Sequence, residues 1–233
     1  MKPLTVEVFS DVLCVWAYGG QVRIDQLKAD YSPRVLLQYR FIPVFAAARD
    51  RIERDWKTRG SYEGFARHLH EVAANWDHVS LHQGVWLNDR PHSSSVSHLY
   101  LKALQILEKT GELSSQPVAT FKARSVFEEF LWRTRCAFFE QGLNISCTSV
   151  LDELCSSLDL PLTRIHELIN NGEAHAGLHI DTELRDRYQI PGSPTIVFNE
   201  GRQRLYGNVG YRIIDANISE LLDDTNHAGA SWC

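Results

Sequence analysis

The sequence predicts an α/β fold in which a domain of mixed strands and helices is interrupted by a large all-helical insertion. Three observations lead to this prediction. The first 43 residues follow a strand–helix–strand pattern, residues 44–172 show almost only helical periodicity, and the remainder returns to mixed helices and strands. The first two strands are expected to pair in parallel through a right-handed crossover.

The N-terminal elements are marked by short apolar runs and proline. Residues 4–9 alternate apolar and polar side chains, which predicts a strand, and residues 10–14 form a loop. Apolar positions from Trp16 onward predict a helix that ends near residue 29, and the β-branched and aromatic run 35–42 predicts a second strand that ends at Pro43.

Helical spacing recurs through the middle of the chain, and the C-terminal part regains strands. Apolar periodicity predicts helices at 62–75, 95–109, 117–140, 149–157 and 162–170. The mixed-charge run 49–59 is typical of a solvated helix face or a loop. After the helical segments, the sequence predicts a helix at 173–188, a turn at 189–194, strands at 195–199 and 204–207, and a helix at 213–222.

Composition excludes several classes of protein. The 233 residues carry a net charge of −5, so no electrostatic footprint for nucleic acid is expected. No apolar run reaches the length of a membrane helix, and residues 1–9 lack the apolar core of a signal peptide. We therefore expect a cytoplasmic protein with no nucleic-acid or membrane partner; the oligomeric state is left open.

The five cysteines have an odd count and scattered positions, which is not typical of a secreted disulfide framework. Cys136 and Cys155 lie on apolar helical faces and are expected to pack in the core, whereas Cys147 lies near a helix start. The histidines at 68, 70, 78 and 82 lack the companion ligands of a familiar site, so we expect no metal.

Cys14 is the residue with the clearest chemical potential. It lies where the first strand turns into the first helix, and the unpaired N–H groups and dipole of a helix start favour an anion. A thiol placed there is expected to have a lowered pKa and to be a good nucleophile. A buried, inert cysteine is the alternative.

Pro194 and Ser193 form the second feature, in the sequence Pro-Gly-Ser-Pro directly before a predicted strand. X–Pro bonds are the ones that become cis at useful frequency. A cis Pro194 would present the Ser193 backbone as a docking edge for an extended peptide or a thiol ligand, and an ordinary loop turn is the alternative.

Together the two segments resemble a known family. Residues 10–20, Ser-Asp-Val-Leu-Cys-Val-Trp-Ala-Tyr-Gly-Gly, are similar to the active-site segment of the DsbA-like thioredoxin superfamily, and in its FrnE-like branch the pattern is S-D-x-x-C-P-W-C-Y-x-G. Residues 190–195 resemble the cis-proline loop of that family. The resemblance covers about residues 4–222 and implies a thioredoxin-like fold with a helical insertion. It also implies Cys14 as the attacking cysteine and a substrate site that includes Trp16, Ala17, Ser193 and Pro194.

The implied domains are a discontinuous thioredoxin-like domain at 1–43 and 173–227, a helical insertion at 44–172 and a flexible tail at 228–233. Within the motif, Val15 and Ala17 replace the proline and second cysteine of the family, so the site is a monothiol, Cys-Val-Trp-Ala. The second thiol of a dithiol site resolves the mixed disulfide, and here another group must do so. The candidates for this resolving group are glutathione and Cys233, whose chain segment is long enough to fold back to Cys14. If glutathione binds, a basic residue of 49–59 could pair with its carboxylates.

The leading hypothesis is a thiol-dependent oxidoreductase that acts through a mixed disulfide on Cys14, with a thiol or disulfide substrate and no tightly bound cofactor other than, at most, glutathione. A glutathione-binding transferase or isomerase is the first alternative, because the kappa glutathione transferases and hydroxychromene-carboxylate isomerases of the same superfamily bind glutathione with Ser at this position. The second alternative is a non-catalytic binding module that uses the cis-proline edge.

Overall fold

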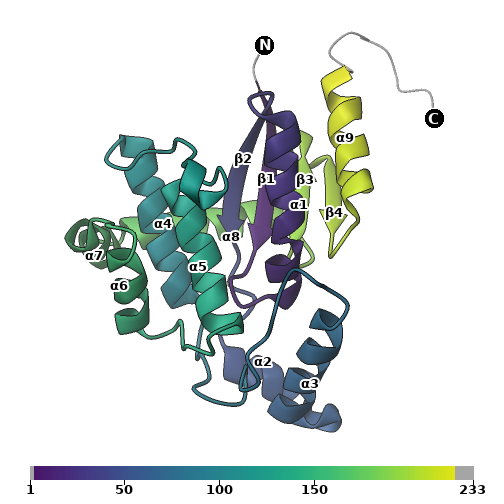
Figure 1. The fold of residues 1–233 in the computed structure, drawn as a ribbon, viewed down its shortest axis with the longest axis vertical. Coiled ribbons are helices and arrows are strands. Elements are labelled where there is room, and N and C mark those ends of the chain that lie inside the picture. The colour runs from purple at the N-terminus through teal and green to yellow at the C-terminus, as the bar shows by residue number, and fades with distance from the viewer. Residues whose placement is uncertain (1–2, 224–233) are drawn as a thin grey trace.

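A four-stranded mixed sheet forms the centre of the computed structural model, which describes residues 3–223 (Figure 1). The strands are β1 (Leu4–Ser10), β2 (Val35–Phe41), β3 (Thr195–Phe198) and β4 (Gln203–Tyr206), in the order β2-β1-β3-β4. β2 runs parallel to β1, whereas β3 is antiparallel to both β1 and β4. The N- and C-terminal parts of the chain therefore build one sheet.

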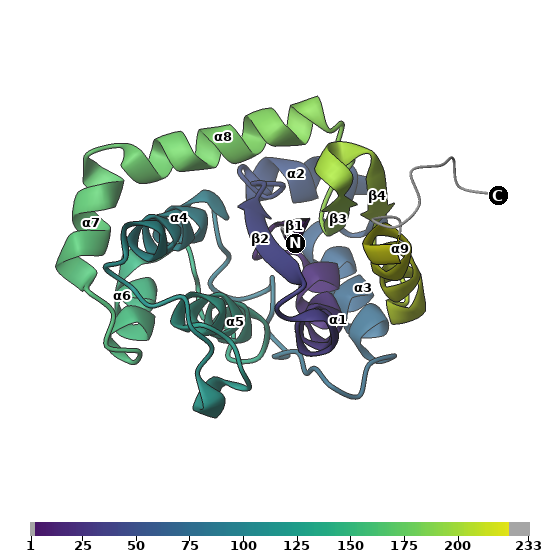
Figure 2. The same ribbon diagram turned by 90° about the horizontal axis from the view of Figure 1, so that it is seen from above.

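The two faces of the sheet are covered by different helices (Figure 2). Helices α1 (Val15–Tyr31) and α9 (Tyr211–Asp223) lie on one face, where Val6 and Val8 join the main core. The alternate residue Phe9 points to the other face and packs with Ile42, Ile190 and Val197 beneath the end of helix α8. This period-two alternation explains why the short first strand is buried on both sides.

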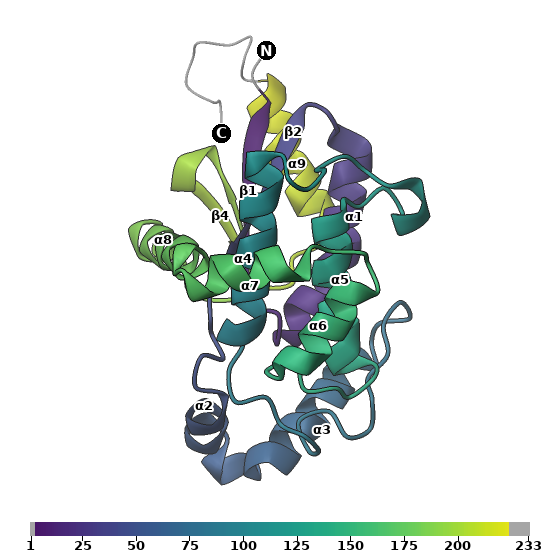
Figure 3. The same ribbon diagram turned by 90° about the vertical axis from the view of Figure 1, so that its left-hand side faces the viewer.

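Every described element between β2 and β3 is helical. Helices α4 to α7 gather beside β2, while α2 and α3 lie beyond one end of the sheet (Figures 1 and 3). Their bounds are α2 Ala48–Asp55, α3 Ser61–Ala73, α4 Ser95–Thr110, α5 Val126–Phe139, α6 Thr148–Ser156, α7 Leu162–Asn170 and α8 Glu173–Arg187, with 3₁₀ turns at Lys57–Arg59, Ala119–Phe121 and, between β3 and β4, Asn199–Gly201. None of the helices within residues 3–223 is long and apolar enough to span a bilayer.

The expected helix 117–140 is wrong in its first turns. Residues 118–124 form a loop with a 3₁₀ turn, and the helix begins at Val126. Ser125 and Glu128 form a capping box in which the Ser125 hydroxyl accepts the Glu128 N–H, and the Glu128 carboxylate accepts the Ser125 N–H. These two bonds satisfy orphan donors of the first turn and fix the start of the helix at this point.

The outer edge of β2 is closed by side chains of the neighbouring helices. Gln105 of α4 donates its amide Nε2 to the Tyr39 carbonyl at 2.8 Å, and the Phe41 N–H donates to Asp181 Oδ2 of α8 at 2.9 Å. Asp181 is fully buried and also accepts from Lys102 Nζ at 2.9 Å. The strand edge is thus tied to both helices that flank it.

Candidate active site

Cys14 lies at the N-terminus of α1, in the N-cap position. Its backbone is extended (φ −86°, ψ 113°), and its carbonyl accepts the N–H groups of Ala17 and Tyr18 at 3.1 and 3.0 Å. The preceding loop is closed by the Cys14 N–H, which donates to the Asp11 carbonyl at 3.1 Å. The sequence placed the thiol correctly at the strand-to-helix turn, and only 7% of the residue is exposed.

The loop that contains Pro194 lies directly against Cys14. The Ser193–Pro194 peptide bond is cis. The Cys14 Sγ–H donates to the Ser193 carbonyl at 3.2 Å, and the Asp11 N–H donates to Ser193 Oγ at 2.9 Å. Two segments about 180 residues apart in the chain are therefore joined by a pair of hydrogen bonds, and the thiol contacts the residue that precedes the cis-proline.

The expected lowered pKa of Cys14 is wrong. Burial raises the pKa of the Cys14 thiol above its ordinary value, and the negative charge of Asp11 adds to the rise. The Ser193 side chain lowers the pKa, and so do the N–H groups of Ala17 and Trp16, as expected of a helix start, but desolvation is the larger effect. The sequence showed the helix start and did not show the burial.

Asp11 organises the loop before Cys14, a role that sequence reasoning missed. Its buried carboxylate accepts the Leu13 N–H at 2.8 Å on Oδ1, and the Phe45 N–H at 2.8 Å and the Ser94 hydroxyl at 2.7 Å on Oδ2. These donors come from the Cys14 loop, the segment after β2 and the start of α4. The one available signal was an acidic residue directly after a buried strand.

His98 of α4 supports the same loop and was also missed. Its Nε2 accepts the Val12 N–H at 3.2 Å, so this nitrogen carries no proton. Burial lowers the pKa of His98, which favours the neutral imidazole. His98 and the Asp11 carboxylate thus fix the backbone N–H groups of Val12 and Leu13, and Ser94 and His98 of the helical insertion contact this loop.

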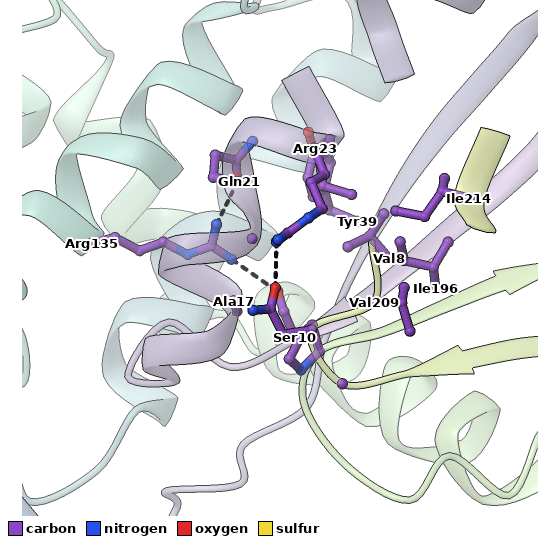
Figure 4. A pocket seen from close by; sticks show the side chains of 15 residues that line it. Val8, Ser10, Ala17, Gln21, Arg23, Tyr39, Arg135, Ile196, Val209 and Ile214 are labelled. Carbon is purple, nitrogen blue, oxygen red and sulfur yellow. Dashed lines mark hydrogen bonds between the residues drawn. The ribbon is translucent and has the colours of Figure 1, made fainter. Parts of the chain in front are cut away.

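A cleft of about 610 Å³ opens beside Cys14. Trp16, which is 37% exposed, lines it and packs edge-on against Trp76 with 5.4 Å between ring centroids. Ser193 also lines this cleft, whereas Ala17 and Pro194 line a separate small cavity behind α1 (Figure 4). Most residues of the cleft wall are apolar. Besides Cys14, its charged or titratable members are Arg51, Asp55, His68, Arg185 and Tyr206.

The other cysteines of the described chain have surroundings of their own. Cys155 is fully buried, as predicted, and burial raises its pKa to about 12. Cys136 is half-buried beside Glu140, and Cys147 is exposed at the N-cap of α6. The four described cysteines are free thiols. Cys233, the candidate resolving residue, lies outside the described residues.

The histidines of the helical insertion have separate surroundings. His68 lies against Trp56 at 5.1 Å between ring centroids and lines the cleft, whereas His78 bonds the Gly19 carbonyl at 2.8 Å. In the described part of the chain, no three His, Cys, Asp or Glu side chains are grouped so that they could hold a metal ion.

The fold is a mixed sheet with a helical insertion, and a cysteine at the start of the first helix faces a cis-proline loop. These features define a thioredoxin-like protein. The family described as "DSBA-like thioredoxin domain" matches residues 5–218. The chain belongs to this family, and the predicted fold is confirmed.

Solved structures with the same fold are distant in sequence. A probable DsbA oxidoreductase from Streptomyces coelicolor is 15% identical with a TM-score of 0.68, covering 99% of this chain and 94% of its own. The cytosolic disulfide reductase DsbM from Pseudomonas aeruginosa is 18% identical (TM-score 0.64; 97% and 100% covered). A 2-hydroxychromene-2-carboxylate isomerase is 13% identical (TM-score 0.63; 97% and 100% covered). No curated protein matches the sequence.

Proposed function

We propose that the protein is a monothiol thiol–disulfide oxidoreductase whose nucleophile is Cys14. The observation that carries the proposal is the 3.2 Å contact between the Cys14 Sγ and the carbonyl of Ser193, beside the cis Pro194 and at the mouth of the cleft. A substrate chain that enters the cleft can pair with the Ser193 backbone and bring its sulfur to Cys14.

The reaction runs through one mixed disulfide. The Cys14 thiolate attacks one sulfur of a substrate disulfide R–S–S–R′; a Cys14–S–S–R bond forms, the original S–S bond breaks, and R′S⁻ leaves and takes a proton from water. Since Ala17 stands where a second thiol would resolve this bond, a glutathione thiolate attacks the R sulfur, releases Cys14 and forms GS–SR. A second glutathione converts GS–SR to RSH and GSSG, so two glutathione molecules supply both electrons.

Glutathione suits the cleft because its two carboxylates need cations. Arg51 and Arg185 line the cleft, and the guanidinium of Arg51 stays 4.0 Å from Asp55, a loose pair that leaves donors for a ligand. The distant relative DsbM has also been solved with GSH. Its description as cytosolic, together with the four free thiols here, supports a cytoplasmic setting in which glutathione is the reductant.

The raised pKa of Cys14 sets the pH range of the reaction. At neutral pH only a small fraction of the thiol is ionised, but a thiolate of high pKa is intrinsically more nucleophilic. We therefore expect slow exchange at pH 7 that accelerates as the pH rises.

The test is mass spectrometry of the intact protein after exposure to oxidised glutathione, with each modified cysteine mapped. One glutathione on Cys14 that is removed by reduced glutathione supports the proposal. Cys14→Ser should lose this adduct and all turnover. Cys147→Ser is the matched control, because Cys147 is also a helix N-cap and is more exposed but faces no cis-proline loop.

Other mapped outcomes identify the alternatives. A Cys14–Cys233 bridge would make the C-terminal cysteine the resolving group. An unmodified Cys14, in a protein that still binds glutathione, would end the oxidoreductase proposal and leave the glutathione-dependent transferase or isomerase and the non-catalytic binding module.

A glutathione-dependent isomerase or transferase is the second candidate, and one observation favours it. Burial keeps Cys14 protonated near neutral pH, so the thiol can act as a hydrogen-bond donor to a bound ligand without forming a disulfide. The isomerase of the same fold gives this candidate a precedent. Calorimetric titration of Cys14→Ser with glutathione tests this candidate: it requires saturable binding that survives the substitution, and loss of binding removes it.

A further inference from the structure

Arg135 of α5 is a buried cation that forms no direct ion pair within residues 3–223; the carboxylates of Asp25 and Asp11 act on it only through space. Only 2% of the residue is exposed. Its Nη1 donates to Gln21 Oε1 at 2.5 Å and its Nη2 to Ser10 Oγ at 3.1 Å, both neutral groups. Nε is buried without a hydrogen-bond partner, and the two other guanidinium nitrogens donate only to neutral groups.

The guanidinium borders a small cavity behind the first turns of α1 (Figure 4). A second cation, Arg23 of α1, lines the same cavity, donates to the neutral side chain of Asn208, and likewise has no ion pair among the described residues. Among the described residues, no Asp or Glu lines this cavity. The rest of its wall is mostly aliphatic and includes Val8 of β1 and Ile214 of α9. The site therefore offers positive charge and donors, and no acidic group.

A buried charge without a counter-charge is costly, and an unpaired buried donor adds to that cost. Water could satisfy the donor but could not neutralise the guanidinium. The cavity measures about 30 Å³, room for one or two water-sized particles, so it fits a small anion better than a phosphate ester or a peptide carboxylate with its chain. A mostly aliphatic wall also favours an anion that gives up its hydration easily.

We propose that this cavity is a binding site for a small monovalent anion of halide size, held between Arg135 and Arg23. The anion takes the Nε–H of Arg135 and supplies a negative charge in direct contact with the guanidinium. The site is separate from the cleft that contains the Cys14 thiol, and the proposal does not depend on the reaction assigned to that thiol.

The test compares sodium bromide with sodium gluconate, whose anion is too large to enter, at constant ionic strength. Thermal unfolding midpoints are measured for the wild type, for Arg135→Met and for Arg133→Met, a control on the same helix outside the cavity. The unfolding midpoints of the wild type and the control should rise by about 3–5 °C for each tenfold increase in bromide concentration above the dissociation constant. The midpoint of Arg135→Met should not change with bromide.

Equal midpoints in bromide and gluconate for the wild type would overturn the proposal, as would an unchanged bromide response in Arg135→Met. A response to sodium formate without one to bromide would overturn the halide assignment. If Arg135→Met does not fold, Arg23→Gln replaces it, with a weakened bromide response expected. Crystals of the wild type soaked in bromide should show an anomalous peak between the two guanidinium groups, and a peak elsewhere only would count against the site.

Discussion

Asp11 carries three hydrogen bonds on one buried carboxylate, and replacing it by asparagine tests how the Cys14 loop is held. Asparagine has a single acceptor oxygen. If that oxygen keeps the bonds from Phe45 and Ser94, the new amide NH₂ faces the Leu13 N–H, so one donor loses its acceptor and meets another donor.

The expected cost follows from these contacts. A hydrogen bond to a charged acceptor contributes about 1.5–3 kcal/mol, and each of the two retained bonds weakens when the acceptor becomes neutral. Asp11→Asn should therefore lower the free energy of unfolding by about 2–4 kcal/mol. For a domain of this size, that corresponds to a fall in Tm of about 5–12 °C.

Urea denaturation followed by tryptophan fluorescence measures this change, with the exposed loop substitution Asp77→Asn as the control. The same variant should alkylate faster at Cys14 at pH 7.5, because the charge of Asp11 is one of the groups that raise the thiol pKa. A loss below about 0.5 kcal/mol would refute the reasoning, since losses that small are typical of surface substitutions.

Three further predictions concern other parts of the structure. The alkylation rate of Cys14, measured against pH, should keep rising beyond about pH 8.5, the ordinary thiol value, because burial raises its pKa; a plateau at pH 7 or below would contradict this. Burial raises the pKa of Glu108 to about 7, so the contribution of its neutral carboxyl to stability is present below pH 4.5 and is lost as the pH rises through 7. At pH 8, Glu108→Gln should therefore be about 1–2 kcal/mol more stable than wild type, a figure reduced to allow for partial exposure. Equal urea midpoints of the two proteins at pH 8 would count against this prediction. Gly64→Ala should cost about 1–3 kcal/mol, because a Cβ would lie 1.8 Å from the Arg59 carbonyl oxygen, whereas Gly20→Ala, with open space around its Cβ, should be neutral or stabilising in the same thermal melt.

Local patterns were sufficient for most elements of the fold. The helix at residues 162–170 was predicted with its observed bounds, because its apolar spacing begins after a proline and ends at two asparagines and a glycine. The error at 117–125 came from extending apolar spacing across Ser125, where the Ser-x-x-Glu capping pattern was available in the sequence. The helix Ala48–Asp55 fell in a charge run that was compatible with either helix or loop.

Only those features of the site that depend on neighbouring residues in the sequence were predictable. The position of Cys14 at a helix start is local, but its burial depends on loops that contact it from other parts of the chain. The partners of Asp11 lie 34 and 83 residues away, at Phe45 and Ser94. A single arginine in a helical pattern gives no sign that it will be buried, so Arg135 could not be identified from the sequence.

The ties between β2 and its flanking helices have a consequence for self-association. An open strand edge is a template on which another chain can add a strand, and aggregation follows from that exposure. Here the outward Tyr39 carbonyl and Phe41 N–H are already occupied by Gln105 and Asp181, so a foreign strand would have to displace them, including a carboxylate shared with Lys102. Growth of the sheet into a larger assembly is therefore hindered at the C-terminal end of β2, whereas no such bonds to the β4 edge are found among the described residues.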